Sequence, residues 1–530
     1  MKILNPNFNV GSLVYEVACQ NPEIQAIRYK GSFLTYRDLN YDALLIASFL
    51  LKQGAENKTI GILGERNITS LTGVLGSIYA GCSYTPLNTN YPQDKVSKII
   101  KEAEIRYIIC QYKDLSKYHE IFKENNVVIL MPSDETILVD KNLIFKEQIK
   151  KIQPLSHPKN VCEETNAYIL YTSGTTGNPK GVQVSHANLI SFLSNMTGIY
   201  ELPRGFRASQ TFDLSFDLSV CDLFFTWTNA GTLCLLSEED RLLPSDYINR
   251  EEIYFWYSVP TLASIMNKFG SLKDGVFPTL KYSLFCGEPF PLELAKKWSR
   301  SACNSTVENL YGPSEATIHL TRRILNKQDF KKKFYNGIMP IGRPFADHFV
   351  KIVNKDFQLV KNGEVGQLVL SGPQITKGYL KDKIKTKKSF VRLDWDLNNH
   401  TWYLTGDLGF FNSDGDLEFF GRNDSQIKLA GRRVELGEIE YALRKYPQLE
   451  DIIILPDRNK KKEIIGVVGF TMSPINDDTI DLIRSDSTRL IESIFFPRRI
   501  ITISKFPTSD SGKISRKKLL AKYFKEGQLI

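Results

Sequence analysis

Residues 168–186 read YILYTSGTTGNPKGVQVSH, an apolar strand that runs into a loop rich in glycine, threonine and serine. Glycines lack a Cβ and let backbone N–H groups crowd around an anion, while hydroxyls and Lys180 add donors and positive charge. The stretch therefore predicts a polyphosphate cradle at the end of a buried strand. It does not fit the P-loop pattern, because Gly181 follows the lysine where Ser or Thr is required. A flexible surface turn between two strands is the alternative interpretation.

Short apolar runs alternate with helical patterns on both sides of this loop, which is typical of α/β sheets with helices on their faces. Residues 340–423 differ, because short strand patterns there are separated by Gly, Asp and Asn turns, and they predict an antiparallel, strand-rich lobe. We place a boundary near Asp424, giving a large domain over 1–423 and a smaller α+β domain over 424–530. The runs read as buried strands are TIGILG, SYTPL, RYIIC, VVILM, AYILYTS, GTLCLL and YSLFCG.

Composition excludes several classes of protein. With 530 residues, 42% of them hydrophobic, and a net charge of +9, the chain is neither a single small module nor a disordered or fibrous protein. The mild basic excess has no interleaved aromatic platform, so no nucleic-acid partner is expected. No signal peptide and no membrane-spanning window is present, and we expect a soluble cytoplasmic protein without a membrane partner. The eight cysteines form no Cys-x-x-Cys pair and predict buried reduced thiols, and the six histidines lack zinc-site spacing.

A series of motifs in a fixed order resembles the adenylate-forming superfamily, which comprises acyl-CoA ligases, luciferases and the adenylation domains of nonribosomal peptide synthetases. The resemblance covers nearly the whole chain and is strongest to the amino-acid-activating members, with features of the D-alanine:carrier-protein ligases. Ser314 stands where threonine is usual and Asn88 where aspartate is common, and both differences are chemically mild. Beside YTSGTTGNPKG, the motifs are LTYRDL (34–39), GCSYTPLNTNYP (81–92), FDLSVCDLFF (216–225), NLYGPSEAT (309–317), GEVGQLVLSGPQITKGYL (363–380), YLTGDLG (403–409), GRNDSQIKLAGRRVELGEIE (421–440) and PTSDSGKISRKKL (507–519).

The resemblance implies an ATP site. Asn309 and Tyr311 would hold adenine, Asp407 the ribose hydroxyls, and Arg422 the ribose or α-phosphate. Glu315 would bind Mg²⁺ beside the phosphates, since Mg²⁺ prefers few carboxylates together with phosphate oxygens. The other implied ATP-binding residues are Thr172, Ser173, Gly174, Thr175, Thr176, Gly177, Lys180, Gly312, Ser314 and Lys428, of which Thr176 and Lys180 are also implied to be catalytic.

The resemblance also implies an amino-acid pocket. Asp217 matches the aspartate that binds the substrate ammonium in amino-acid-activating relatives, and fatty or aryl acids offer no such cation. No other charged residue is expected at the side-chain end, which favours a small amino acid such as cysteine, serine or alanine. His319 is expected in the pocket wall, and His186 is expected to be structural. The remaining implied pocket residues are Leu218, Cys221, Tyr257, Leu284, Cys286, Gly287, Leu310 and Ile318.

The C-terminal region carries the residue that the resemblance makes catalytic. Lys513 would bridge the substrate carboxylate and the α-phosphate, and thereby offset the repulsion between two anions in the transition state. No general base is needed, because the attacking carboxylate is already ionised. The same lysine must leave before a carrier thiol reaches the carbon, and we expect residues 425–530 to move about a hinge at Asp424.

The motifs together predict a stand-alone enzyme that forms aminoacyl-AMP from ATP and transfers the amino acid to the phosphopantetheine thiol of a separate carrier protein. No carrier segment is expected to follow, because the chain ends about 17 residues after Lys513. An acyl-CoA ligase, a D-alanine:carrier-protein ligase, a nonenzymatic nucleotide sensor and a kinase are the alternatives.

Lys513→Ala is expected to abolish most adenylate formation while leaving ATP affinity nearly unchanged, because the charge acts mainly in the transition state. The rate of amino-acid-dependent pyrophosphate exchange into ATP should fall about 10²–10³-fold. Exchange within threefold of the wild type, on a folded variant, would remove Lys513 from the site.

Overall fold

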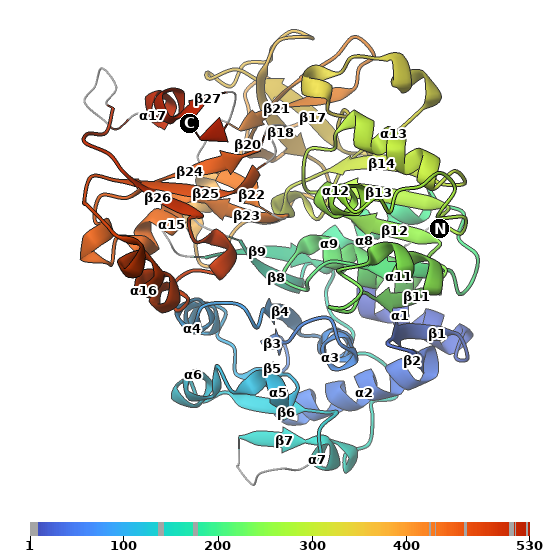
Figure 1. Cartoon of the computed structure of the whole chain (residues 1–530). Helices are drawn as coiled ribbons and strands as arrows, with labels where there is room; N and C mark the ends of the chain where they lie inside the picture. Colours follow the sequence, from blue (N-terminus) through green and yellow to red (C-terminus); the bar gives the residue numbers. More distant parts are fainter. Residues whose placement is uncertain are drawn as a thin grey trace. The chain divides into compact units, whose positions relative to one another are not determined.

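The computed structural model describes residues 9–135, 142–172, 179–422, 426–429, 431–459, 464–507, 514, 516–525 and 528–529. The chain divides into two compact units. Figure 1 shows the whole chain, with colours that follow the residue number from the N-terminus to the C-terminus. Unit 1 comprises Met1–Thr89, Ile100–Tyr171 and Gly181–Asn423, and unit 2 comprises Asn90–Ile99, Thr172–Lys180 and Asp424–Ile530.

A seven-stranded sheet contains the strands on either side of the quoted loop, in the order β7-β6-β5-β3-β4-β8-β9. The pairs from β7 to β8 are parallel, and every residue of β4 is buried, as expected for a sheet covered on both faces. The strands are β3 (Thr59–Leu63), β4 (Ser83–Leu87), β5 (Tyr107–Ile109), β6 (Val128–Met131), β7 (Leu143–Phe145), β8 (Asn166–Thr172) and β9 (Lys180–Ser185).

A nine-stranded sheet has the order β16-β15-β14-β13-β12-β10-β11-β1-β2. Its central strands are parallel, whereas β2, β15 and β16 pair antiparallel at the two edges. The strands are β1 (Gln25–Tyr29), β2 (Ser32–Thr35), β10 (Arg207–Gln210), β11 (Thr232–Leu235), β12 (Phe255–Ser258), β13 (Tyr282–Cys286), β14 (Thr306–Tyr311), β15 (Thr321–Ile324) and β16 (Arg343–Pro344).

Helices cover these sheets, and polar caps mark where the longer ones begin. Helix α2 starts after Thr35, whose side chain accepts from the Asp38 N–H while the Asp38 carboxylate accepts from the Thr35 N–H. A Cβ on Gly76 of α3 would lie 2.7 Å from Ile46 of α2, so the close packing of these helices requires glycine. The helices of unit 1 are α1 (Val10–Gln20), α2 (Tyr36–Lys52), α3 (Ile68–Tyr79), α5 (Tyr112–Leu115), α6 (His119–Glu124), α7 (Lys146–Lys150), α8 (His186–Thr197), α9 (Asp217–Val220), α10 (Thr226–Thr228), α11 (Pro244–Arg250), α12 (Pro260–Lys268), α13 (Leu292–Ser301) and α14 (Lys383–Ser389).

Residues 340–423 form the antiparallel lobe that their turn-rich sequence predicts. Four of its five strands pair in the order β17-β18-β20-β19. The fifth strand, β21, pairs with residues 407–411 of the long strand β20, whereas β19 pairs with residues 402 and 403. The strands are β17 (Phe349–Val353), β18 (Gly366–Ser371), β19 (Phe390–Val391), β20 (Trp402–Phe411) and β21 (Leu417–Arg422).

Unit 2 is a smaller α+β body. Strand β24 pairs antiparallel with β25, which pairs parallel with β26, and β22–β23 and β27–β28 form two short ribbons. The predicted fold class, α/β sheets with an antiparallel lobe and a small α+β region, is confirmed. The elements are α4 (Gln93–Glu102, which continues into unit 1), β22 (Gln426–Leu429), β23 (Arg432–Glu435), α15 (Leu436–Leu443), β24 (Ile453–Arg458), β25 (Ile464–Thr471), α16 (Asp477–Ser487), β26 (Arg499–Thr502), α17 (Arg516–Tyr523), β27 (Phe524–Lys525) and β28 (Gln528–Leu529).

The expectation that all eight cysteines are buried is wrong for three of them. Cys19, Cys162 and Cys303 are exposed, because each lies at or beyond the end of a helix or in a connecting loop rather than in a strand. All eight are free thiols. Within the described ranges, no helix combines the length and the apolar character needed to cross a bilayer.

Candidate active site

Three neighbouring parallel strands bring six of the predicted site residues of unit 1 toward one edge of the nine-stranded sheet. β12, β13 and β14 run in the same direction, so their carboxyl ends lie together, which is where open α/β sheets bind ligands. The register places Tyr257 beside Leu284 and Cys286 beside Leu310. The strand ends thereby gather Tyr257, Leu284, Cys286, Asn309, Leu310 and Tyr311.

A hydrogen-bond network centres on Asp407 of β20. The Tyr311 hydroxyl donates to Asp407 Oδ2 at 2.6 Å, and the Arg422 guanidinium of β21 donates to Oδ1. The Asp407 carboxylate is 7% exposed, and its orientation is therefore set by two donors from other strands. Each carboxylate oxygen has two lone pairs, so both oxygens retain acceptor capacity for ribose hydroxyls. The structure thus brings together three of the residues that the sequence assigns to the nucleotide.

The two polar atoms of the Asn309 side chain differ in their hydrogen bonding. Its amide nitrogen donates to the backbone oxygens of Met339 and Pro340, both at 3.0 Å. Its Oδ1 is buried and has no hydrogen-bond partner among the described residues. A buried acceptor without a partner carries a desolvation cost that a ligand N–H donor removes. Asn309 is therefore prepared to accept from an amino group such as that of adenine.

The turn after β14 is crowded and strained. A Cβ on Gly312 would lie 2.4 Å from the His319 Cα, so only glycine fits this position. Thr317 and Ile318 both have positive φ, at 54° and 75°, which is costly for β-branched residues. Gln374 holds the turn, because its side-chain nitrogen donates to the backbone oxygens of residues 316, 317 and 319.

Glu315 lies in this turn, in the short 3₁₀ segment Ser314–Ala316, and its side chain is fully buried. The Tyr379 hydroxyl donates to Glu315 Oε1 at 2.8 Å. The Glu315 backbone oxygen accepts from the Thr376 N–H at 3.0 Å. The carboxylate is thus held by the segment that follows β18.

The residues predicted to line the amino-acid pocket are mostly buried and apolar. The Tyr257 hydroxyl and His319 Nδ1 lie 3.0 Å apart, and His319 Nε2 is buried without a hydrogen-bond partner among the described residues. Burial, followed by the charge of Arg322, lowers the pKa of His319 to about 3, so the imidazole is neutral. Burial also raises the pKa of Tyr257, and nearby Cys286, Cys221 and Asp217 raise it further. Leu218, Leu284, Leu310 and Ile318 are buried as well.

Asp217 begins α9, which continues through a π-helical turn, Cys221–Phe225, into α10. Such π turns are frequent at functional sites. The Asp217 side chain is half-buried, and it lies near enough to raise the pKa of Tyr168. Gly287, just past β13, has a φ of 92°, and a Cβ there would approach Leu218 at 3.5 Å. Asp217 and the pocket residues therefore lie together.

Unit 2 holds the remaining described site residues. Thr172 ends β8 with a buried hydroxyl that has no partner in the described part of the chain, and Lys180 begins β9. Lys180 Nζ lies 3.7 Å from Glu435, and Lys428 lies in β22. Ser173, Gly174, Thr175, Thr176, Gly177, Asp424 and Lys513 fall outside the described residues.

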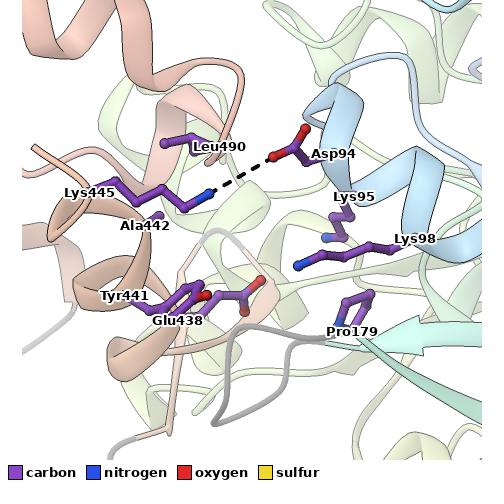
Figure 2. Close-up of a pocket in the computed structure, with 9 residues that line it drawn as sticks. All are labelled: Asp94, Lys95, Lys98, Pro179, Glu438, Tyr441, Ala442, Lys445 and Leu490. Carbon is purple, nitrogen blue, oxygen red and sulfur yellow. Dashed lines mark ion pairs between the residues drawn. The ribbon is translucent and has the colours of Figure 1, made fainter. Parts of the chain in front are cut away.

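A pocket of about 40 Å³ in unit 2 lies between α4 and α15 (Figure 2). Lys445 and Asp94 pair across it at 4.0 Å, and Lys95 and Lys98 point toward Glu438. Burial raises the pKa of Glu438, and the positive charges of Lys95 and Lys98 lower it in part. The pocket is far too small for a nucleotide. Its lining residues are Asp94, Lys95, Lys98, Pro179, Glu438, Tyr441, Ala442, Lys445 and Leu490.

Comparison with known proteins identifies the family. The AMP-binding enzyme family matches residues 14–380. The chain belongs to the AMP-binding enzymes. The D-alanine--D-alanyl carrier protein ligase of Lacticaseibacillus casei is 29% identical over 97% of this chain and 99% of its own length. Gramicidin S synthase 2 of Aneurinibacillus migulanus is 31% identical over 97% of this chain, which spans only 11% of that protein.

A solved AMP-binding structure agrees with this assignment. The crystal structure of the Vibrio cholerae adenylation domain AlmE in complex with glycyl-adenosine-5'-phosphate has a TM-score of 0.85 and 27% identity, and 98% of each chain is covered. The chain is thus an ATP-using ligase that forms an adenylate, and it is similar to carrier-protein ligases.

Two residues of this AMP-binding enzyme site have no role in the sequence-based assignment. Gln374 and Tyr379 both lie in the motif GPQITKGYL, yet their contacts are to residues 55 to 64 positions earlier in the chain. The sequence gives one indication of these two residues, which is that they are polar and lie in a quoted motif. Their distance in sequence from the turn after β14 does not predict that they contact it. His186, which the sequence leads us to expect as a structural residue, is fully buried, and its Nδ1 accepts from the Val10 N–H at 3.4 Å.

Asp407→Asn is expected to weaken ATP binding about 10- to 100-fold, because a hydrogen bond to a charged group contributes about 1.5–3 kcal/mol. The KM for ATP in pyrophosphate exchange measures this effect. Asp414→Asn, at an exposed turn of the same lobe, is the matched control. An unchanged KM for ATP in a variant of wild-type melting temperature would contradict the assignment.

Proposed function

We propose that this enzyme activates a small, uncharged amino acid as its adenylate and transfers it to the phosphopantetheine thiol of a carrier protein. The observation that carries the proposal is the half-buried Asp217 beside a pocket of neutral side chains. An amino acid offers both a carboxylate for ATP and an ammonium for Asp217. Acids without an amine would leave that carboxylate facing an apolar group, which is unfavourable.

The charged groups nearest to the pocket support an uncharged substrate side chain. Arg322 pairs with Glu308 through two hydrogen bonds of 2.5 and 2.6 Å, so its charge is already matched. Burial raises the pKa of Asp222 well above its ordinary value, which favours the neutral carboxyl. Among the described residues, Arg322 and Asp222 thus offer no unmatched ion to a charged substrate side chain.

We also propose that the side chain of the substrate amino acid is small. The pocket wall combines buried leucines with Tyr257 and His319, whose polar edges bond to each other at 3.0 Å. Relatives of this chain are named for D-alanine or were solved with a glycyl adenylate. Glycine and alanine are therefore the first substrates to test, ahead of the serine and cysteine that the sequence also suggests.

The proposed ATP site places adenine at Asn309 and Tyr311 and the ribose at Asp407. Mg²⁺ fits the donor set at Glu315, a buried carboxylate in the turn that follows the adenine residues. When bound, Mg²⁺ would neutralise phosphate charge. Glu315 would hold it, with Tyr379 orienting the carboxylate. Lys513 remains the proposed cation at the reacting carboxylate and α-phosphate.

Asp217→Asn is expected to reduce amino-acid use far more than ATP binding, because the substrate ammonium loses its ion pair. Breaking a buried pair costs about 3–5 kcal/mol, or roughly 10²–10³-fold or more in kcat/KM for the amino acid. Pyrophosphate exchange should be measured with glycine, both alanine stereoisomers, serine, cysteine, and a fatty and an aryl acid.

Asp246→Asn, an exposed carboxylate in the first turn of α11, serves as the control for this change. A wild-type preference for an acid without an amine would overturn the proposal. If the enzyme transfers the amino acid to coenzyme A and not to a holo carrier protein, the proposed adenylation step stands and the proposed acceptor is wrong.

Asp424→Pro tests the proposed hinge. Proline restrains φ near −65° and should hinder a rotation that alternates between the two half-reactions. We expect either adenylation, measured by pyrophosphate exchange, or thioester formation, measured by loading of a holo carrier protein, to fall much more than the other. Equal loss in both, or loss in neither, would contradict domain alternation.

A further inference from the structure

The segment 376–380 connects two parts of unit 1 that lie far apart in the sequence. On one side it pairs with β9: the Leu380 N–H donates to the Gly181 oxygen at 2.8 Å, and the Gln183 N–H donates to the Gly378 oxygen at 3.2 Å. Val182 and Tyr379 form an antiparallel bridge between these bonds. The strand that leaves the quoted loop is thus joined to this segment through backbone hydrogen bonds.

On its other side the segment holds Glu315. The Thr376 N–H donates to the Glu315 backbone oxygen at 3.0 Å, and the Tyr379 hydroxyl donates to Glu315 Oε1 at 2.8 Å. Both bonds are buried, since Glu315 is 0% and Tyr379 6% exposed. The backbone of Glu315 and one oxygen of its carboxylate are therefore both held by the same five-residue segment.

Tyr379 is itself held in one orientation. Its N–H donates to the Thr386 hydroxyl of α14 at 3.0 Å. Its ring packs edge-on against Phe390 at a centroid distance of 5.9 Å, and Lys385 Nζ lies 5.7 Å from the ring centre. A side chain restrained by packing and hydrogen bonds can orient a partner without losing further conformational freedom. The phenol is thus a rigid donor.

We infer that Tyr379 is a positioning residue, which sets the orientation of the Glu315 carboxylate for the Mg²⁺ of MgATP. The inference rests on the proposed function of Glu315. A phenol is suited to this role, because it is neutral and fixes a carboxylate without cancelling the negative charge that a cation requires. Hydrogen-bond partners of metal ligands typically change metal affinity 10- to 100-fold when they are removed.

An ordinary core tyrosine is the competing explanation. A core role depends on the ring, whereas a positioning role depends on the hydroxyl. Tyr379→Phe keeps the ring, its packing on Phe390 and the backbone bonds to β9, and it removes the hydroxyl that donates to Glu315. The substitution therefore separates the two explanations.

The test measures Mg²⁺ dependence in the full-length protein. For Tyr379→Phe, we expect the Mg²⁺ concentration at half-maximal ATP binding, followed by calorimetry, to rise about 10- to 100-fold. Mn²⁺ binding in the presence of ATP, followed by electron paramagnetic resonance, should weaken to a similar extent. ATP binding in EDTA should not change, because the adenine and ribose contacts remain.

Tyr84→Phe is the matched control, since Tyr84 is equally buried and its hydroxyl has no hydrogen-bond partner among the described residues. It should leave the Mg²⁺ dependence unchanged. Wild-type Mg²⁺ dependence in Tyr379→Phe, or an equal loss of ATP binding with and without Mg²⁺, would overturn the inference.

Glu315→Gln separates this inference from the function on which it rests. If Glu315→Gln leaves the Mg²⁺ dependence unchanged, the proposed metal role of Glu315 is wrong. If it raises the Mg²⁺ requirement and Tyr379→Phe does not, only the role of Tyr379 is wrong. The combined variant should resemble Glu315→Gln alone, because the hydroxyl acts through that carboxylate.

Discussion

The parallel alignment of β12, β13 and β14 is the constraint on which the described site depends. Parallel neighbours end at the same edge, so the residues that follow each strand are forced together regardless of their distance in sequence. β14 then turns back into the antiparallel β15, and the chain has only residues 312–320 in which to do so. Within this connection, Gly312 is crowded against His319 and Ile318 has a positive φ.

Three buried carboxylates of unit 1 have the same kind of hydrogen-bond partner. A tyrosine hydroxyl donates to Glu308, Asp407 and Glu315, at 3.0, 2.6 and 2.8 Å. Arginines add a second partner for Glu308 and Asp407. A buried carboxylate must be hydrogen-bonded, and a phenol supplies the bond without neutralising the charge.

Sequence reasoning succeeds here where chemistry and local pattern coincide. Apolar runs predicted the strands, and the motifs assigned Tyr311 and Asp407 to one site, where the structure joins them by a hydrogen bond. It fails where a role depends on long-range geometry. Gln374 and Tyr379 contact residues more than 50 positions earlier, and Cys19, Cys162 and Cys303 are exposed although the sequence predicted buried thiols.

These observations explain why the residues proposed for adenine and for Mg²⁺ occur so close together in the sequence. Asn309 and Tyr311 lie at the carboxyl edge of the sheet because β14 ends there, and Glu315 follows within one strained turn. That turn is stabilised from outside, by Gln374 on its backbone and by Tyr379 on its carboxylate. Strain of this kind persists only when the surrounding structure over-determines it. The antiparallel lobe therefore has two parts in the proposed site: it supplies Asp407 and Arg422, and it holds a costly conformation of the turn in place.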